Sequence, residues 1–305
     1  MMTKKKTCRV LLVSDMHYTT QESPAELKLK FPDANTSIAA GDAFGHTQRE
    51  KIEKVFEGIA YEDAKEPLDA VFVLGDLSID DYNFRNLPIN FCERFKIDCL
   101  DRLRCPSFVL AGNHDSYPDE LWRDIFGCGR QYSVTVADQV FIMLDTFRAC
   151  PASGASGAQY TPVDTDFLRG ELEKYRGKNI FLCSHFFRVG DESDAFKRLV
   201  RESEDIICLF CGHTHHNGVI ELGEEYGNKQ LFDIGGYGYH GMVINGQYSF
   251  GQFDPAWAWG YQILEISEKE IYTHHRKPPI HYVAENGVFD LEETISGQRT
   301  YPIKA

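Results

Sequence analysis

The sequence predicts an α/β protein built as one large domain, and three observations support this prediction. Five short apolar runs have the composition of strands buried on both faces. Apolar residues at helical spacing occupy most of the intervals between these runs. No linker rich in Pro, Gly or Ser divides them, and 305 residues are enough for one sizeable core. We therefore expect one domain over residues 1–283 and a peripheral extension over residues 284–305.

Each of the five predicted strands ends in a cluster of polar residues. The strands are expected at residues 10–13, 71–74, 108–111, 180–183 and 206–211. The clusters that follow them are Asp15-Met16-His17, Gly75-Asp76, Gly112-Asn113-His114-Asp115, Ser184-His185 and Gly212-His213-Thr214-His215. Ligands of α/β sheets bind at the carboxyl ends of the strands, so the clusters mark the expected functional site.

The helical patterns lie between the strands and place helices on the sheet faces. Helices are expected over residues 47–64, 87–103, 118–126, 165–175 and 193–201. Pro67 follows the first helix and ends it, because proline cannot continue a helix. Asp164 or Thr165 caps the fourth helix, since either side chain can accept from the first free backbone N–H groups.

The remaining strands are shorter and follow turn residues. Residues 132–136 and 139–144 predict a hairpin that turns at Ala137-Asp138. Late strands are expected at residues 219–222, 229–234, 261–266 and 270–274. The sequence does not indicate a role for the peripheral extension after residue 284.

The polar clusters predict a metal site. Their carboxylate and amide oxygens, mixed with imidazole nitrogens, suit Mn, Fe or Zn ions rather than a thiolate site. If the chain stays strand-like, residues two apart point to the same side, so Asp15 converges with His17, and His213 with His215. Two ions about 3.5–4 Å apart can clamp the attacking and leaving oxygens of a phosphoryl displacement.

The five clusters together resemble the motifs of the calcineurin-like metallophosphoesterases. The family pattern reads D-x-H, G-D, G-N-H-D/E, a lone H and G-H-x-H, and all five blocks occur here in order between residues 15 and 215. The resemblance implies a four-layer sandwich, in which two mixed β-sheets pack face to face and helices cover both outer sides.

The resemblance also implies a role for each matching residue. Asp15, His17 and His215 match the ligands of one metal, Asn113, His185 and His213 match those of the other, and Asp76 matches the bridging carboxylate. His114 matches the histidine that faces the scissile phosphate.

The implied activity is hydrolysis of a phosphate ester, either a phosphodiester (a phosphodiesterase) or a phosphomonoester (a phosphatase). A hydroxide that bridges two metal ions would attack in line, without a covalent enzyme intermediate. His114 would stabilise charge on the phosphate or protonate the leaving alkoxide. Two alternatives stay open: a nuclease of the same superfamily, and a non-catalytic, metal-binding interaction scaffold.

Two features depart from the family pattern. Many members carry an aspartate three positions after the bridging one, where this chain has Ile79, so Asp115 or Asp80 is the candidate support for His114. A second Gly-Asp pair ends at Asp42, but it follows a poor strand, so we interpret Asp42 as a loop or N-cap residue.

Further residues near the blocks are candidates for substrate contacts. Arg148 and Arg188 each follow a predicted strand and could reach a phosphate oxygen, with a solvated surface arginine as the alternative for both. The aromatic segment 237–259 either borders the site as a loop or caps a sheet edge. His216 follows a matched ligand and is expected to point away from the site.

The composition of the chain indicates which partners and which cellular compartment to expect. A net charge of -14 argues against a surface that binds nucleic acid, because such a surface carries a stripe of basic residues. The same charge is compatible with a small phosphorylated substrate, because bound metal cations would dominate the charge near the site. No apolar run reaches transmembrane length, so no membrane partner is expected. The oligomeric state is left open.

The nine cysteines, an odd number scattered through predicted strands and helices, favour a reduced, cytoplasmic setting. Cys208 and Cys211 have the spacing of a redox motif, but residues three apart in a strand face opposite ways, so two packed thiols are expected.

Overall fold

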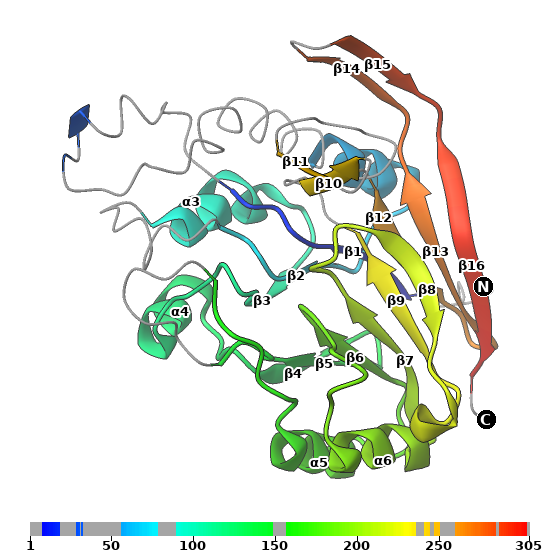
Figure 1. The fold of residues 1–305 in the computed structure, drawn as a ribbon. Coiled ribbons are helices and arrows are strands. Elements are labelled where there is room, and N and C mark those ends of the chain that lie inside the picture. Colours follow the sequence, from blue (N-terminus) through cyan, green and yellow to red (C-terminus); the bar gives the residue numbers. More distant parts are fainter. Residues whose placement is uncertain are drawn as a thin grey trace.

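The protein folds into four layers, with two β-sheets face to face and helices on both outer sides (Figure 1). The computed structural model describes residues 8–18, 29–30, 32, 56–78, 90–148, 157–235, 241–244, 247–250, 260–284 and 287–303. This arrangement confirms the α/β class and the sandwich that the family resemblance implies.

The first sheet has the order β16-β13-β12-β1-β2-β3. Strands β1, β2 and β3 are parallel, whereas β12, β13 and β16 add antiparallel partners on the β1 side. The strands are β1 (Cys8–Val13), β2 (Ala70–Leu74), β3 (Ser107–Leu110), β12 (Tyr261–Ile266), β13 (Glu270–Lys277) and β16 (Thr294–Pro302).

The second sheet has the order β4-β5-β6-β7-β9-β8, with β5, β6, β7 and β9 parallel. Its strands are β4 (Tyr132–Val136), β5 (Gln139–Leu144), β6 (Ile180–Ser184), β7 (Ile206–Cys211), β8 (Asn217–Glu221) and β9 (Gln230–Ile234). The predicted β4–β5 hairpin is confirmed, and both turn residues, Ala137 and Asp138, have positive φ, as a two-residue type I′ turn requires.

The helices cover the outer faces through separate apolar clusters. Residues 56–65 form a helix that packs on the outer face of the first sheet together with α3 (Phe91–Asp98), the 3-10 turn η1 (Leu100–Arg102) and α4 (Asp119–Phe126). On the second sheet lie α5 (Thr165–Lys174), α6 (Asp194–Glu202) and η2 (Glu224–Tyr226). Asp164 caps α5 by accepting from the N–H groups of Asp166 and Phe167, so the first of the two predicted caps is confirmed.

The space between the sheets is filled by apolar residues from both. Phe141 stacks on Phe72 with ring centroids 4.3 Å apart and on Phe181 at 5.0 Å, which joins the two sheets at their centre. Cys208 belongs to this inner core, whereas Cys211 belongs to the outer core under α5 and α6. Both thiols are free and buried, which confirms the two packed cysteines on opposite faces.

The late part of the chain contains strands that the sequence analysis did not predict. Two hairpins consist of β10 (Gly241–Ile244) with β11 (Gln247–Phe250) and of β14 (Ile280–Ala284) with β15 (Gly287–Leu291). Strand β16 pairs with β13 and forms an edge of the first sheet. The division of the chain at residue 284 stays a prediction. The hairpin β10–β11 falls within the aromatic segment 237–259, most of which lies outside the described residues.

Among the described residues, no helix has the length and apolar composition needed to span a membrane.

Candidate metal centre

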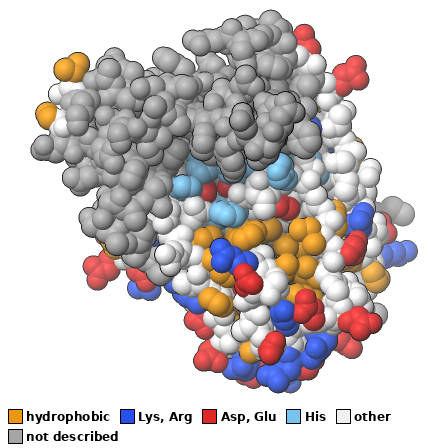
Figure 2. All heavy atoms as spheres, in the orientation of Figure 1, with side chains coloured by type: hydrophobic (Ala, Val, Ile, Leu, Met, Phe, Trp, Pro, Cys, Tyr) orange, Lys and Arg blue, Asp and Glu red, His pale blue; other side chains and the backbone are white. Residues whose placement is uncertain are grey.

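The polar clusters at the ends of β1, β2, β3, β6 and β7 meet at one edge of the sandwich. Backbone hydrogen bonds join the loops directly: Asp15 N donates to Gly75 O (3.0 Å), and His17 N donates to Asp76 O (2.8 Å). Gly212 N donates to His185 O (2.9 Å), which joins the last two clusters in the same way. Figure 2 shows the result, with histidine and acidic side chains gathered on one face.

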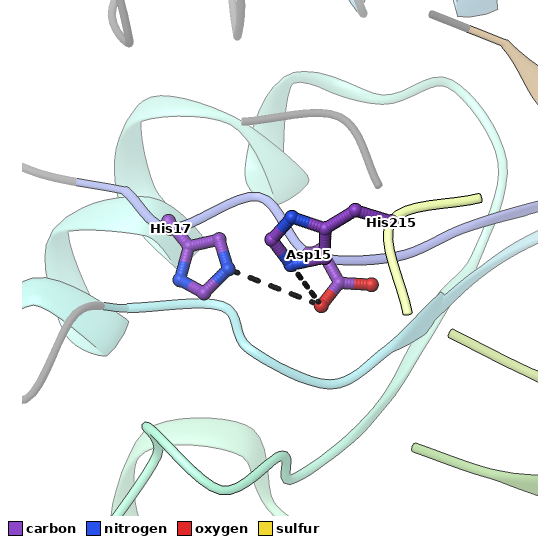
Figure 3. Close-up of side chains that lie close together, drawn as sticks. All are labelled: Asp15, His17 and His215. Atoms are coloured by element: carbon purple, nitrogen blue, oxygen red, sulfur yellow. Dashed lines mark ion pairs between the residues drawn. The ribbon is translucent and has the colours of Figure 1, made fainter. Parts of the chain in front are cut away.

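The first group of potential metal ligands consists of Asp15, His17 and His215, whose donor atoms all lie within 4.8 Å of one another. Asp15 Oδ1 is 3.2 Å from His215 Nε2 and 3.9 Å from His17 Nε2, as the dashed lines of Figure 3 show. This oxygen is buried and has no hydrogen-bond donor in suitable geometry among the described residues. A buried carboxylate oxygen between two imidazoles fits a cation that is shared by all three side chains.

The second group consists of Asp76, His185 and His213, again with all donor atoms within 4.8 Å of one another. His185 Nε2 lies 3.2 Å from both Asp76 Oδ2 and His213 Nδ1. Asn113 Oδ1 is 3.1 Å from the same nitrogen, so the amide predicted to belong to this group faces it.

Asp76 lies between the two groups. Its Oδ2 atom is 3.2 Å from His185 Nε2 in the second group and 3.8 Å from His17 Nε2 in the first. Its Oδ1 atom accepts from His114 N at 2.9 Å, which fixes the orientation of the carboxylate. This is the position that a carboxylate shared by two metal ions would take.

The orientation of His185 favours metal binding. Its Nδ1 atom lies 2.8 Å from the carbonyl oxygen of Leu74, which can only accept, so Nδ1 carries the proton and donates. In the neutral ring, Nε2 therefore presents its lone pair to Asp76 and Asn113. A backbone acceptor behind the ring is the usual way in which proteins orient a metal-binding histidine.

The electrostatics show that the site attracts positive charge. Burial would lower the pKa of His185, but the carboxylates of Asp76 and Asp15 raise it to about 10. Burial would raise the pKa of Asp15, but His215 and His185 lower it to about 2. The pKa of Asp76 likewise lies well below its ordinary value, because His185 and His114 outweigh the effect of burial. Without a metal, a proton on His185 supplies the cation that these carboxylates require.

The ligand-bearing loops adopt an uncommon backbone conformation. Asp15, His17, Asp76, His213 and His215 all have φ between 43° and 73°, the left-handed region that non-glycine residues rarely enter. A non-glycine residue in this conformation costs about 1–3 kcal/mol of folding free energy. The conformation persists where neighbouring residues enforce it, typically at functional sites. Asp15 and His17 do lie together in the first group, whereas His213 and His215 belong to different groups. The loops that carry all four residues are left-handed at these positions, so the predicted strand-like alternation was the wrong cause.

Two motif glycines are required because the site leaves no room for a side chain. A Cβ atom on Gly75, which has φ of 89°, would lie 2.5 Å from His185 Nδ1. A Cβ atom on Gly112 would lie 2.1 Å from Asp76 Oδ1 and 2.3 Å from Asp76 N. Both glycines therefore allow one cluster to approach another.

We expect Gly112→Ala to displace Asp76 and to lower the metal content of the purified protein. Overpacking of this kind typically costs about 1–3 kcal/mol of stability. Gly218→Ala is the matched control, because a Cβ atom there meets no atom of the part of the chain that the structure describes within 4 Å. Elemental analysis and urea unfolding of both variants measure the two effects. Equal metal content in the two alanine variants would show that the close approach of Gly112 does not position Asp76.

His114 lies beside the first group, with its ring centroid 5.3 Å from that of His17. Asp115, one of its two candidate supports, has both oxygens engaged elsewhere. It accepts from the N–H groups of Leu77 (3.0 Å), Ser78 (2.9 Å) and Gly112 (2.9 Å). Asp115 therefore ties the loop after β3 to the loop after β2. Asp80, the other candidate, lies outside the described residues.

Arg130, a buried arginine that the sequence analysis missed, connects two loops next to the site. Arg130 Nε donates to Asp145 Oδ2 (2.6 Å), and its terminal nitrogens donate to the carbonyl oxygens of Asp115 (3.0 Å) and Phe147 (3.2 Å). The guanidinium thus connects the loop after β3 to the loop after β5, across the two sheets. No sequence motif contains Arg130, and only its burial and contacts reveal the role.

We expect Arg130→Met to destabilise the protein by about 3–5 kcal/mol, because Asp145 would be left buried without its cation. Arg169→Met is the control, since among the described residues Arg169 forms an exposed ion pair with Asp166 alone, of a kind worth about 0–1 kcal/mol. Urea midpoints of the two variants provide the comparison. Similar midpoints would mean that Arg130 does not brace the two loops.

The two arginines predicted to contact substrate differ in their surroundings. Arg148 donates through its guanidinium to the carbonyl oxygens of Asp145 (3.2 Å) and Pro162 (2.5 Å). Arg188 has a side chain that is 54% exposed and a guanidinium carbon 5.0 Å from the centroid of the Tyr160 ring. Of the two, Arg188 has the guanidinium that is less engaged with the backbone.

The fold and this edge define a class of two-sheet proteins with a histidine- and carboxylate-rich centre. A model of the calcineurin-like phosphoesterases matches residues 8–217, which include all seven candidate ligands and His114. Because this match covers more than half of the chain, the protein belongs to the calcineurin-like phosphoesterase family.

Solved structures share the fold at low sequence identity. A dimetal phosphatase from Danio rerio is 12% identical with a TM-score of 0.52, over 94% of this chain and 98% of that chain. PhoD is also 12% identical with a TM-score of 0.53, over 97% of this chain and 70% of that chain. No curated protein matches this chain by sequence.

Proposed function

We propose that the protein is a dinuclear metal-dependent hydrolase of phosphate esters. Asp15, His17 and His215 would hold one ion, Asn113, His185 and His213 the other, and Asp76 both. The position of Asp76 Oδ2 between His185 Nε2 and His17 Nε2 is the observation that supports this proposal most strongly. Family membership and the fold support it independently.

The residues present fit two divalent ions. The donor set of carboxylate oxygens, an amide oxygen and imidazole nitrogens suits Mn, Fe or Zn. Asp15 Oδ1 provides a lone pair for the first ion. His185 donates through Nδ1 to Leu74 O, so its Nε2 atom can provide a lone pair for the second ion. When bound, the ions would polarise the phosphate oxygens and supply hydroxide near neutral pH.

The side chains around the ions then perform three tasks. Asp15 and Asp76 keep their negative charge at neutral pH, because neighbouring histidines hold the pKa of each carboxyl low. Asp115 and Arg130 fix the loop that carries Asn113 and His114. His114, at the edge of the first group, would donate a proton to the leaving oxygen or stabilise charge on the phosphate.

A substrate panel tests the proposal. Purified protein with Mn²⁺ would be assayed with phosphomonoesters, phosphodiesters and cyclic nucleotides, each with and without a chelator. We expect metal-dependent hydrolysis of at least one class, and the preferred class would assign the enzyme as a phosphatase or a phosphodiesterase. Absence of turnover in a protein that holds two ions would contradict the proposed activity.

A further inference from the structure

Beside the second ligand group lies a row of aromatic side chains that the proposed hydrolysis does not require. Phe186 packs against the metal-ligand candidate His213, with ring centroids 4.6 Å apart. Tyr160 meets Phe186 edge to face at 6.0 Å, and Phe147 contacts both Tyr160 (5.8 Å) and His213 (5.9 Å). We call these three residues, Phe147, Tyr160 and Phe186, the aromatic shelf.

The shelf is held in place by polar contacts behind the rings. The carbonyl oxygen of Phe186 accepts from the hydroxyls of Thr146 (3.0 Å) and Ser184 (3.1 Å). The hydroxyl of Tyr160 donates to Glu192 and accepts from Arg188 N at 3.2 Å. These contacts fix the backbone of Phe186 and the side chain of Tyr160, so the two residues lose little conformational entropy when a ligand covers them, which favours binding.

The cationic side chain of Arg188 lies next to the aromatic shelf, beside Tyr160. The guanidinium of Arg188 lies over the Tyr160 ring, and the ion pair to Asp191, at 3.9 Å, is long and exposed. Arginine can stack on planar groups while it donates hydrogen bonds at its edge. The order outward from the second ligand group is therefore His213, Phe186, Tyr160 and Arg188.

Two residues of the aromatic shelf are partly accessible to solvent. Phe186 and Tyr160 are half-buried, whereas Phe147 is buried beneath them. Figure 2 shows apolar side chains directly below the histidine cluster on that face, with basic and acidic side chains among them. Apolar rings beside a charged centre, with one flanking cation, are the lining that binds a planar aromatic group.

We propose that the aromatic shelf and Arg188 bind a planar aromatic group of the substrate, so that the enzyme prefers phosphate esters whose alcohol part carries such a ring. This inference rests on the proposed phosphoesterase function. The phosphate would lie at the metal ligands, and the ring would pack against Phe186, with the nearly perpendicular Tyr160 ring and the Arg188 guanidinium at its edge.

The test compares benzyl phosphate with cyclohexylmethyl phosphate, and the methyl diesters of the same two alcohols. The members of each pair have similar size and similar leaving groups, and they differ mainly in whether the ring is aromatic. An aromatic contact worth about 1.4 kcal/mol corresponds to a tenfold preference. We therefore expect the wild-type kcat/KM for the benzyl ester to exceed that for the cyclohexylmethyl ester by about tenfold.

Two variants test whether Phe186 and Arg188 cause the preference for the aromatic ester. Phe186→Leu and Arg188→Gln should each bring the ratio of the two kcat/KM values toward one, measured at equal metal content. Phe167→Leu changes a half-buried phenylalanine in the outer core under α5 and should keep the wild-type ratio. A wild-type ratio near one, or a ratio that neither variant changes, would overturn the inference. Absence of turnover with these four esters and with the whole substrate panel above, at two ions per chain, would overturn the proposed function itself.

Discussion

The Asp76→Asn variant is expected to lose nearly all hydrolytic activity and to bind less metal than the wild type. The amide removes one negative charge from a carboxylate whose Oδ2 atom faces both ligand groups. Loss of a residue that only supports a metal ligand already costs about 10–100-fold in affinity or activity. For a ligand shared by two ions, we therefore expect a loss of more than about 100-fold, measured by elemental analysis and by turnover of an aryl phosphate.

Asp42→Asn is the matched control for this variant, because Asp42 ends the only other Gly-Asp pair that the sequence analysis considered for this block. It should retain metal content and activity close to those of the wild type. If Asp42→Asn lost metal and Asp76→Asn kept it, the assignment of the bridging carboxylate would be wrong.

The second large effect is expected for His114→Ala. If His114 protonates the leaving oxygen, the variant should lose about 10²–10⁴-fold on esters with alkyl leaving groups and far less on esters with acidic aryl ones. The reason is that an aryl oxide departs without a proton. If His114 only stabilises charge on the phosphate, the loss should be similar for both kinds of ester.

A series of leaving groups of graded pKa, assayed at unchanged metal content, distinguishes these roles. A uniform loss across the series would reject proton donation by His114. Full activity on every ester would place His114 outside the catalytic site, despite its hydrogen bond to Asp76 and its ring contact with His17.

Much of the fold could be predicted from local patterns. The five apolar runs are the parallel strands β1, β2, β3, β6 and β7, because strands buried on both faces must be apolar throughout. Cys208 and Cys211 face opposite cores because alternation within a strand follows from its geometry. The cap of α5 was predictable for a similar reason, since it depends on residues within one turn.

Other features depend on contacts between distant residues. Strand β16 has an exposed, polar sequence, and its pairing with β13 determines its conformation. Arg130 binds Asp145 and two carbonyl oxygens in separate loops, and an arginine outside every motif gives no sign of this in the sequence. Asp115 was a candidate support for His114, but its carboxylate accepts from backbone N–H groups of the loop after β2 and of its own loop.

The candidate site was predicted in its composition but not in its local geometry. The residue types at the strand ends were sufficient to predict a mixed oxygen and nitrogen metal centre. The left-handed conformations of Asp15, His17 and Asp76 were not predictable, because these residue types favour that region only weakly and the neighbouring loops enforce it.

The central claim is that two metal ions bound by these residues are needed for phosphate ester hydrolysis. The most direct measurement is a titration of metal-free protein with Mn²⁺, in which bound metal and turnover of an aryl phosphate are followed together. We expect binding to saturate at two ions per chain and activity to appear with the second. Saturation at one ion, or hydrolysis that persists in the metal-free protein, would contradict it.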